Sequence, residues 1–347
     1  MASVTKPTVI DLFAGAGGLS LGFEMAGFEV IWSNDHDKWT AATYDKNFGK
    51  GIMHLGSIEE VTEFPKADLV IGGYPCQGFS LAGNRLVADP RNKLYREFAR
   101  CIRQVQPKFF VAENVPGMLT LDDGKIIQAM IREFSSINGG YNVKFTPEPL
   151  NAKWYGVPED RQRVFIVGVR KDIKFDFKFP SRIRGEPGET IIVDGRSRKL
   201  KPYVTLRDAI GSMPAPKEGE VYPTGYSSIY MSRNRKRDWD DVSFTIQAGA
   251  RHAPQHPGGL PMRKVKWSDT HSREDAKFKG SKELYHWLFQ GEKNRRLSYK
   301  ECAAIQSFPK DFEFEGPLVE KYKQIGNAVP PLLAKAVAEE IMLYFKK

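Results

Sequence analysis

The first half of the chain alternates short apolar runs with segments whose apolar residues recur every three to four positions. Short runs of this kind predict buried strands, and the longer spacing predicts amphipathic helices. The expected strands are 8–13, 29–33, 67–72, 109–113 and 164–169. The expected helices between them are 19–26, 38–47, 94–104 and 125–134. Such alternation predicts an α/β fold, with a mostly parallel sheet covered by helices on both faces.

The pattern changes near residue 180. From there almost to residue 300 the chain is rich in Gly, Pro, Arg and Lys, and its apolar residues show little periodicity. Helical spacing returns at 299–306 and at 331–344. A chain of 347 residues exceeds the usual size of one hydrophobic core. We therefore expect a larger domain of residues 1–179 and 319–347, and a smaller, irregular domain of residues 180–318.

Charge gives a first indication of a partner. The sequence holds 52 Lys and Arg residues against 42 Asp and Glu residues, for a formal net charge of +10. Such an excess suits a polyanion such as nucleic acid, because each phosphate contact releases counterions, although a basic surface can also serve solubility alone. No apolar run is long enough to cross a bilayer, and the first residues lack the layout of a signal peptide. We expect a cytoplasmic protein without a membrane partner.

The three cysteines are too few and too scattered for a disulfide framework, and without a Cys-x-x-Cys pair no structural metal site is expected. Cys101 and Cys302 lie in stretches with helical spacing, where a thiol usually serves as a small buried hydrophobic group. Cys76 differs from both. It follows an expected strand, directly after Pro75 and close to two glycines. These neighbours would present its thiol on a stiff loop at the carboxyl end of the sheet.

A glycine-rich turn, Phe13-Ala14-Gly15-Ala16-Gly17-Gly18, follows the first strand. Glycine allows a sharp turn and a close approach of the backbone to a ligand. The spacing departs from the Gly-x-Gly-x-x-Gly of pyrophosphate sites, because position 20 is Ser. Asp35 ends the second strand, where a carboxylate can accept hydrogen bonds from both hydroxyls of a ribose. Each feature alone also fits a tight turn or a helix cap, but together they favour a nucleoside-type ligand.

A carboxylate and two arginines are expected at the same edge of the sheet as Cys76. Glu113 ends a strand, and Arg161 and Arg163 stand just before another. This set suits C5 of cytosine, which is a poor nucleophile until a thiolate adds at C6. A neutral Glu113 could donate a hydrogen bond to N3, and an arginine could polarise O2. After C5 has attacked the methyl group of a sulfonium, elimination of the thiol, with loss of the C5 proton, would restore the aromatic ring.

Seven motifs follow one another in the order found in bacterial DNA cytosine-5 methyltransferases, and the chain resembles this family over nearly its whole length. Their residues are Phe13–Gly18, Pro75–Gln77, Asp89–Leu94, Glu113–Val115, Arg161–Arg163, Arg296–Pro309 and Gln324–Pro330. A bare Pro-Cys or Glu-Asn-Val is common by chance, whereas seven motifs in order are specific. The resemblance implies a Rossmann-like domain that uses S-adenosylmethionine and releases S-adenosylhomocysteine, joined to a smaller target-recognition domain.

The resemblance also implies roles for individual residues. Cys76 would be the nucleophile, Glu113 would contact N3, and Arg161 and Arg163 would orient the base. The implied cofactor contacts are Phe13, Ala14, Gly15, Gly17, Gly18, Asp35, His36, Ser57, Ile58, Pro75, Leu94, Asn327 and Val329. Because Asn327 lies near the C-terminus, the last helix should pack against the first domain.

Several positions depart from the family pattern. Ser57 stands where most members have an Asp that holds the adenine amino group, and Asp35 replaces the more common Glu. His36 stands where an aromatic or apolar residue often covers the adenine. Asn92 replaces a Gly, and Glu159 replaces a Gln. Serine can accept a hydrogen bond but carries no charge, so we expect ordinary chemistry with weaker cofactor affinity.

Two segments of the basic middle region, 230–239 and 242–257, resemble the recognition domain of the branch that methylates the inner cytosine of GGCC. Arginine reads O6 and N7 of guanine in the major groove, which makes Arg233, Arg235 and Arg251 the expected guanine readers. A solvated run of charges is the simpler alternative. The other expected DNA contacts are Ser80, Arg91, Arg237 and Gln247.

The target base must leave the duplex before a thiol can reach it, as holds for DNA methyltransferases as a class. The loop 79–91 could close over the flipped base, and Gln247 could enter the gap that the base leaves. The resemblance further implies double-stranded DNA as substrate, a monomer on DNA, and a cognate restriction endonuclease acting on the same site.

Three other interpretations stay open at this point. A methyltransferase of the same fold could use the same motifs on tRNA, although the large, arginine-rich recognition region matches a DNA branch. A DNA-binding module could have lost catalysis, although every chemical residue is present. An oxidoreductase with a nicotinamide or flavin cofactor rests on the glycine turn alone and leaves Cys76 and Glu113 unexplained.

Overall fold

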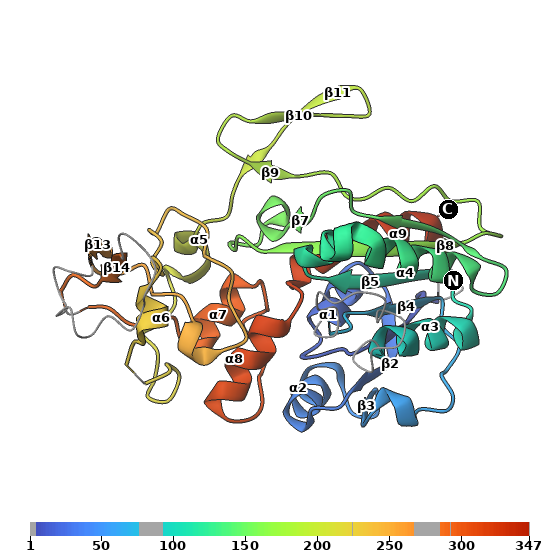
Figure 1. Cartoon of the computed structure of the whole chain (residues 1–347), viewed down its shortest axis with the longest axis horizontal. Helices are drawn as coiled ribbons and strands as arrows, with labels where there is room; N and C mark the ends of the chain where they lie inside the picture. The colour runs from blue at the N-terminus through green and yellow to red at the C-terminus, as the bar shows by residue number, and fades with distance from the viewer. Residues whose placement is uncertain (1–4, 76–92, 224, 267–284, 292, 347) are drawn as a thin grey trace.

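Two lobes make up the protein in the computed structural model, a sheet with its covering helices in one and mostly short elements in the other (Figure 1). The structure describes residues 5–75, 93–223, 225–266, 285–291 and 293–346. Three residues with expected roles, Cys76, Ser80 and Arg91, lie outside the described residues together with the loop 79–91.

The central sheet contains β1 (Thr8–Leu12), β2 (Glu29–Asp35), β3 (Met53–Leu55), β4 (Leu69–Gly72), β5 (Phe109–Asn114), β6 (Tyr141–Phe145), β7 (Leu150–Asn151) and β8 (Gln162–Arg170). Its strand order is β3-β2-β1-β4-β5-β8-β6, with β7 paired to β8. The strands from β3 to β5 run parallel, and β8 is antiparallel to β5, β6 and β7. The expected parallel sheet is confirmed, and β6 and β7 extend it with an antiparallel edge that was not expected.

Helices cover both faces of the sheet, because successive strand residues point to opposite sides. Val9 and Phe109 pack on the face covered by α1 (Gly18–Met25) and α9 (Pro331–Phe345). Their neighbours Ile10 and Phe110 pack on the face covered by α3 (Lys93–Val105) and α4 (Lys125–Ser136). Burial on both faces explains the continuous apolar runs of these strands. The remaining helix of this lobe is α2 (Lys38–Phe48), which contacts β2 and β3.

The C-terminal helix α9 packs closely on α1, as expected from the position of Asn327. A Cβ atom added to Gly22 would lie 2.4 Å from the Cβ atom of Ala334 and 2.6 Å from the carbonyl oxygen of Pro331. The bare backbone of Gly22 therefore sets the short distance between the two helices. Within the described ranges, no helix has the length and apolar character that a membrane crossing requires.

Short elements build the second lobe, which explains why its sequence shows little periodicity. They are the helices α5 (Leu206–Ile210), α6 (Ser228–Met231), α7 (Tyr299–Ile305) and α8 (Leu318–Asn327), and the hairpin of β13 (Arg263–Lys266) with β14 (Tyr285–Leu288). The pair β9 (Arg184–Gly185) with β12 (Lys201–Pro202) contacts the 3-10 turn Ala152–Tyr155 of the sheet lobe, and the hairpin of β10 (Thr190–Val193) with β11 (Arg196–Lys199) extends from it (Figure 1). Turns of 3-10 helix lie at Ile58–Glu60, Pro116–Leu119, Leu121–Gly124, Ala152–Tyr155 and Ala250–His252.

The core of the second lobe also includes α8. Tyr322 and Ile325 of this helix cluster with Leu297 and with Cys302 of α7. By packing, α8 thus belongs with the second lobe, whereas the sequence placed residues from 319 onward with the first. The domain boundaries themselves stay a prediction. Cys101 and Cys302 are both buried in helices, as expected of thiols that serve as small hydrophobic groups.

Candidate active site

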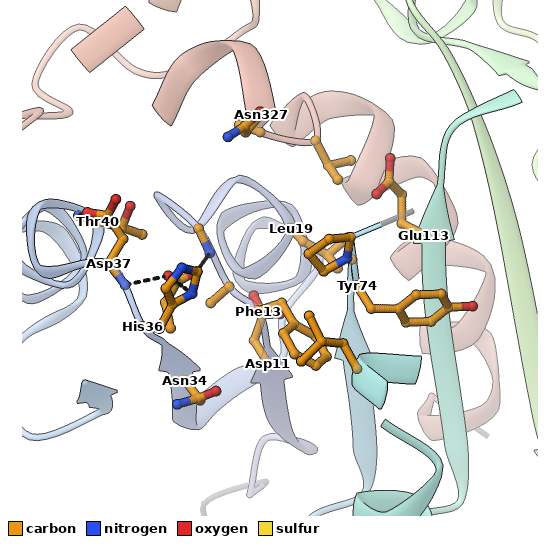
Figure 2. Close-up of a pocket in the computed structure, with 18 of the residues that line it drawn as sticks. Asp11, Phe13, Leu19, Asn34, His36, Asp37, Thr40, Tyr74, Glu113 and Asn327 are labelled. Atoms are coloured by element: carbon orange, nitrogen blue, oxygen red, sulfur yellow. Dashed lines mark hydrogen bonds and ion pairs between the residues drawn. The ribbon is translucent and has the colours of Figure 1, made fainter. Parts of the chain in front are cut away.

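A cavity of about 820 Å³ lies at the carboxyl ends of β1, β2, β4 and β5, beside the segment 324–329 (Figure 2). Its size is typical of sites for a cofactor-sized ligand. Glu113 and Arg163 contribute to its lining. Of the expected cofactor contacts, those that line it are Phe13, Ala14, Gly15, Asp35, His36, Ser57, Ile58, Pro75, Leu94, Asn327 and Val329. The structure thus brings residues from both ends of the chain to one cavity.

Gly17 and Gly18 shape the turn rather than the cavity wall. Gly17 caps α1 in the left-handed conformation, with φ of 86°. A Cβ atom on Gly18 would lie only 2.3 Å from the carbonyl oxygen of Val329. Neither residue lines the cavity, but the bare backbone of Gly18 lets the segment around Val329 approach the turn.

The glycine turn is tied to the tip of β2. The backbone N–H of Gly15 donates to Asp35 Oδ2 over 3.0 Å, and the N–H of Asp37 donates to Asp35 Oδ1 over 2.9 Å. Gly15 has φ of 56°, and a Cβ atom there would meet nothing within 4 Å. Phe13 also adopts a positive φ, 57°, which costs energy in a residue other than glycine. Open space and a strained turn at one place are typical of a ligand site.

Two of the residues that depart from the family pattern line the cavity from different loops, Ser57 after β3 and His36 after β2. The Asn34 amide donates to the carbonyl oxygens of His54 and Gly56, both over 3.0 Å, and thereby fixes the loop after β3. The hydroxyl oxygen of Ser57 accepts from the backbone N–H of Glu59 and starts a 3-10 turn. The imidazole of His36, on the β2 side of the cavity, is 84% exposed. It is therefore free to lie over a ligand.

Asp11 was not expected in the site, and it is the most unusual carboxylate of the cavity. Ser20 donates to its Oδ2 over 2.5 Å, while its Oδ1 is buried without a hydrogen-bond partner. Burial raises the pKa of Asp11 to about 7. A buried carboxylate oxygen in a cavity wall suits a cationic group on a ligand. The signal in the sequence is an acid inside an otherwise apolar strand.

Glu113 is buried at the end of β5, where Arg163 faces it. Arg163 Nε lies 2.7 Å from Glu113 Oε1. Burial raises the pKa of Glu113 above its usual value, although the charges of Arg163 and Arg161 act in the opposite direction. A Cβ atom on Gly73 would lie 2.9 Å from Glu113 Oε2, so Gly73 leaves the space that the carboxyl group occupies. Burial thus shifts Glu113 towards the protonated form, which can donate a hydrogen bond.

The residue next to Glu113 positions the loop that leads to Cys76. The Asn114 amide donates to the carbonyl oxygen of Tyr74 over 3.1 Å, and both residues are buried. The Oδ1 atom of Asn114 accepts from the backbone N–H of Val115. Pro75, the last described residue before Cys76, lines the cavity together with Glu113. Among the described residues, no group of three or more His, Cys, Asp or Glu side chains could hold a metal ion.

A profile of the family described as C-5 cytosine-specific DNA methylase matches residues 7–343. The chain belongs to this family. Type II methyltransferase M.BsuRI of Bacillus subtilis is 46% identical to it, over 97% of this chain and 79% of the relative. Type II methyltransferase M.MthTI of Methanothermobacter thermautotrophicus is 42% identical, over 96% of both proteins. The predicted family and the predicted enzyme class, a DNA cytosine-5 methyltransferase, are confirmed.

Solved structures with low sequence identity support the methyltransferase fold alone. The Entamoeba histolytica methyltransferase EhMeth superposes with a TM-score of 0.68 at 16% identity, over 99% of this chain and 100% of the other. The S. pombe Dnmt2 methyltransferase superposes with a TM-score of 0.61 at 17% identity, over 98% and 99% of the two chains. The expected fold class is confirmed, and the oxidoreductase alternative is excluded by the family.

In this methylase, the two expected base-orienting arginines point to different places. Arg163 lines the cavity beside Glu113, whereas Arg161 does not line it and is 1% exposed. The guanidinium of Arg161 donates to the carbonyl oxygens of Ile246, Gly326 and Ala328. A direct contact of Arg161 with the base, which the resemblance implied, therefore stays a prediction without geometric support.

Ser80 and Arg91 lie outside the described residues, and the other residues expected to contact DNA lie in the second lobe and outside the cavity wall. Arg233, Gln247 and Arg251 are exposed, and Arg251 Nε donates to the hydroxyl of Tyr222. The other two are partly buried against aromatic rings. Arg235 lies 5.1 Å from the ring centroid of Tyr230, and Arg237 lies 4.1 Å from that of Phe244. Their contacts with DNA remain predictions.

Proposed function

We propose that the protein transfers a methyl group from S-adenosylmethionine to C5 of a cytosine in duplex DNA, through a covalent bond between Cys76 and C6 of the base. The observation that carries this proposal is the buried acid Glu113, whose pKa is raised, beside the Pro75 that leads into Cys76. Because burial raises the pKa of Glu113, its carboxyl group is more readily protonated and can then donate to N3 when the thiolate adds.

The cavity fits S-adenosylmethionine, which supplies an electrophilic methyl group on a positively charged sulfur. The open space over Gly15 admits a ligand against the backbone. The Asp35 carboxylate stands at the end of β2, where it can accept from ribose hydroxyls. The unpartnered Oδ1 atom of Asp11 suits the cationic amino-acid part of the molecule. Asn327 and Val329 would close the same cavity from the C-terminal side.

The residues of this chain account for the covalent addition and for the charge that it places on the base. The Cys76 thiolate forms a bond to C6, and the electrons of the C5–C6 double bond move towards C5 and N3. A neutral Glu113 stabilises the charge at N3, and Arg163 holds the carboxyl group in place. C5 would then bond to the methyl carbon of S-adenosylmethionine as the bond from that carbon to sulfur breaks, so that S-adenosylhomocysteine leaves. A water molecule acting as base takes the C5 proton, and departure of the Cys76 thiolate restores the C5–C6 double bond.

We further propose that the second lobe reads a short duplex site like GGCC while the target cytosine is flipped into the cavity. Arg233 and Arg251 are exposed and able to reach base edges in the major groove. The relatives reported above are named Type II methyltransferases, so we propose that a restriction endonuclease acts on the same site. The net charge of +10 supports binding of the enzyme to double-stranded DNA, and we propose that it binds as a monomer.

Transfer of tritium from labelled S-adenosylmethionine tests the proposal. We expect incorporation into a GGCC duplex and none into the same duplex with the site scrambled, with tRNA as a third substrate. Glu113→Gln should lose at least about a hundredfold in rate, because a fixed amide replaces the proton-donating acid. Bisulfite sequencing of plasmid from an expressing strain then locates the methylated base. Incorporation into tRNA alone would overturn the proposal of a DNA substrate. Bisulfite converts unmethylated cytosine, so converted cytosines within GGCC would overturn the proposed recognition site.

A further inference from the structure

We propose that Arg161 is a positioning residue that couples the cofactor cavity to the recognition segment 243–248. The inference rests on the proposed function, because it assigns one ligand to the cavity and another to the second lobe. It concerns a different property, namely how strongly each ligand changes the affinity for the other.

The guanidinium of Arg161 joins two segments that are far apart in the sequence. Its Nη1 donates to the carbonyl oxygen of Ile246 over 3.0 Å. Its Nη2 donates to the carbonyl oxygens of Gly326 and Ala328 over 2.7 and 2.9 Å. Gly326 and Ala328 line the cofactor cavity, whereas Ile246 precedes Gln247 in the recognition segment. One planar group thus connects the cavity wall to the recognition segment.

A second set of contacts ties the same recognition segment to the chain just before β8. Glu159 Oε1 accepts from the backbone N–H of Ile246 over 2.6 Å, and it lies 3.5 Å from Arg161 Nη1. The N–H of Ser243 donates to the carbonyl oxygen of Pro158, and the N–H of Asp160 donates to that of Ser243. Glu159 is as fully buried as Arg161. The pair therefore holds the recognition segment without help from solvent.

The two segments also touch directly. A Cβ atom on Gly326 would lie 2.3 Å from the backbone nitrogen of Ala248 and 2.4 Å from the carbonyl oxygen of Gln247. Close-packed backbone of this kind transmits a displacement instead of absorbing it. A ligand that shifts the wall at Gly326 must therefore move Gln247 as well. By thermodynamic linkage, the factor by which the cavity ligand changes the affinity for DNA equals the factor by which DNA, through Gln247, changes the affinity for that ligand.

Lysine cannot replace Arg161 in this role. An ammonium group is compact and cannot bond to carbonyl oxygens on both segments in the way that a planar guanidinium does. Arg161→Lys keeps the positive charge beside Glu159, so the buried carboxylate remains paired. We expect this variant to fold and to bind each ligand alone with an affinity within about threefold of the wild type, a change that corresponds to less than 1 kcal/mol.

The test is a titration of S-adenosylhomocysteine into the enzyme, with and without a saturating duplex that the wild type methylates. We expect the duplex to tighten binding at least about fivefold in the wild type, the lower end of usual coupling. In Arg161→Lys, the ratio of the dissociation constants of S-adenosylhomocysteine measured without and with the duplex should fall towards one. The matched control is Arg170→Lys, at the other end of β8, where the guanidinium contacts Asp172. It should keep the wild-type ratio.

Gly326→Ala gives a second variant in case Arg161→Lys does not fold. The added methyl group would push residues 247–248 away from the cavity wall at residue 326, and it should also lower the ratio of dissociation constants. An unchanged ratio in the folded Arg161→Lys variant would overturn the inference, as would a ratio of one in a wild type that binds both ligands. A purely structural role would lower the melting temperature and leave the ratio unchanged. A wild type that binds neither ligand would instead overturn the proposed function.

Discussion

At the scale of single residues, the site depends on what surrounds its acids. Glu113 lies opposite Arg163, and an arginine at 2.7 Å would normally favour the ionised carboxylate. Burial at the end of β5 outweighs this effect, so the pKa of Glu113 is raised. The space for the acid depends on a residue without a side chain, because a Cβ atom on Gly73 would almost touch Glu113 Oε2.

Substitution of Gly73 should therefore affect catalysis through Glu113. We expect Gly73→Ala to displace the carboxyl group and to lower kcat at least about tenfold, since small misplacements of a reacting group are costly. The affinity for S-adenosylmethionine should change little. Gly117→Ala is the matched control, because nothing lies within 4 Å of a Cβ atom there. Equal kcat values for the two variants would contradict this account of Gly73.

Asp11 gives a prediction about pH. Its pKa of about 7 means that the carboxyl group is largely protonated at pH 6 and largely ionised at pH 8. A cationic ligand group binds the ionised form, so affinity for S-adenosylmethionine should rise by about tenfold from pH 6 to pH 8 through this group. Calorimetry of wild type and Asp11→Asn in the same buffers measures it. The increase in affinity between pH 6 and pH 8 should vanish in Asp11→Asn. The same increase in both proteins would show that Asp11 does not bind the cationic group of the ligand.

At the scale of elements, the sequence predicts the buried parts well and the edges poorly. The strands β1, β4 and β5 carry mostly apolar runs because both of their faces are covered. The edge strand β6 mixes buried and exposed positions with Asn142 and Lys144, and such a short mixed run carries little signal.

The candidate site shows the same limit, because most of its residues come from motifs but their directions depend on backbone geometry. Arg161 and Arg163 are two apart, and in a regular strand such residues face the same side. The strand β8 begins only at Gln162, so the two side chains diverge. Asp11 and Gly73 were missed because their roles depend on neighbours far away in the sequence.

The contact between α1 and α9 gives a prediction about stability. Gly22→Ala would place a methyl group 2.4 Å from the Cβ atom of Ala334. Overpacking of this kind typically costs about 1–3 kcal/mol, so we expect a lower free energy of unfolding in urea at an unchanged slope. Gly225→Ala, where no atom lies within 4 Å of the added group, should be neutral. A neutral Gly22→Ala would show that the helices separate easily.

At the scale of the whole molecule, the sheet with its helices forms one lobe and mostly short elements form the other (Figure 1). Under the proposed function, the first lobe would carry the chemistry and the second would recognise DNA. The cavity lies at the carboxyl ends of the sheet strands and is closed on its other side by α8, whereas the exposed arginines expected to read DNA lie elsewhere in the second lobe. The buried Arg161 connects them, so we expect the lobes to respond to ligands together. The positive charge of the chain would supply affinity for any DNA, and the second lobe would supply sequence preference.

This division can be tested with Arg233→Gln. If Arg233 reads a guanine, its loss should weaken binding to the methylated sequence by about 1–3 kcal/mol and leave binding to a scrambled duplex nearly unchanged. Arg207→Gln is a suitable control, because Arg207 is exposed in the same lobe but paired with Asp240. Fluorescence anisotropy at fixed salt measures both. Equal weakening on the two duplexes would assign Arg233 to the phosphate backbone.

The covalent step can be observed most directly by mass spectrometry of the enzyme mixed with S-adenosylmethionine and a duplex that carries 5-fluorocytosine at the target. Fluorine at C5 cannot leave as a proton does, so the thiolate cannot depart and the complex is trapped. We predict an adduct of protein, strand and methyl group, with the modified peptide at Cys76 and no adduct in Cys76→Ser. Methylation of ordinary cytosine without any trapped species, or an adduct at another residue, would contradict the mechanism.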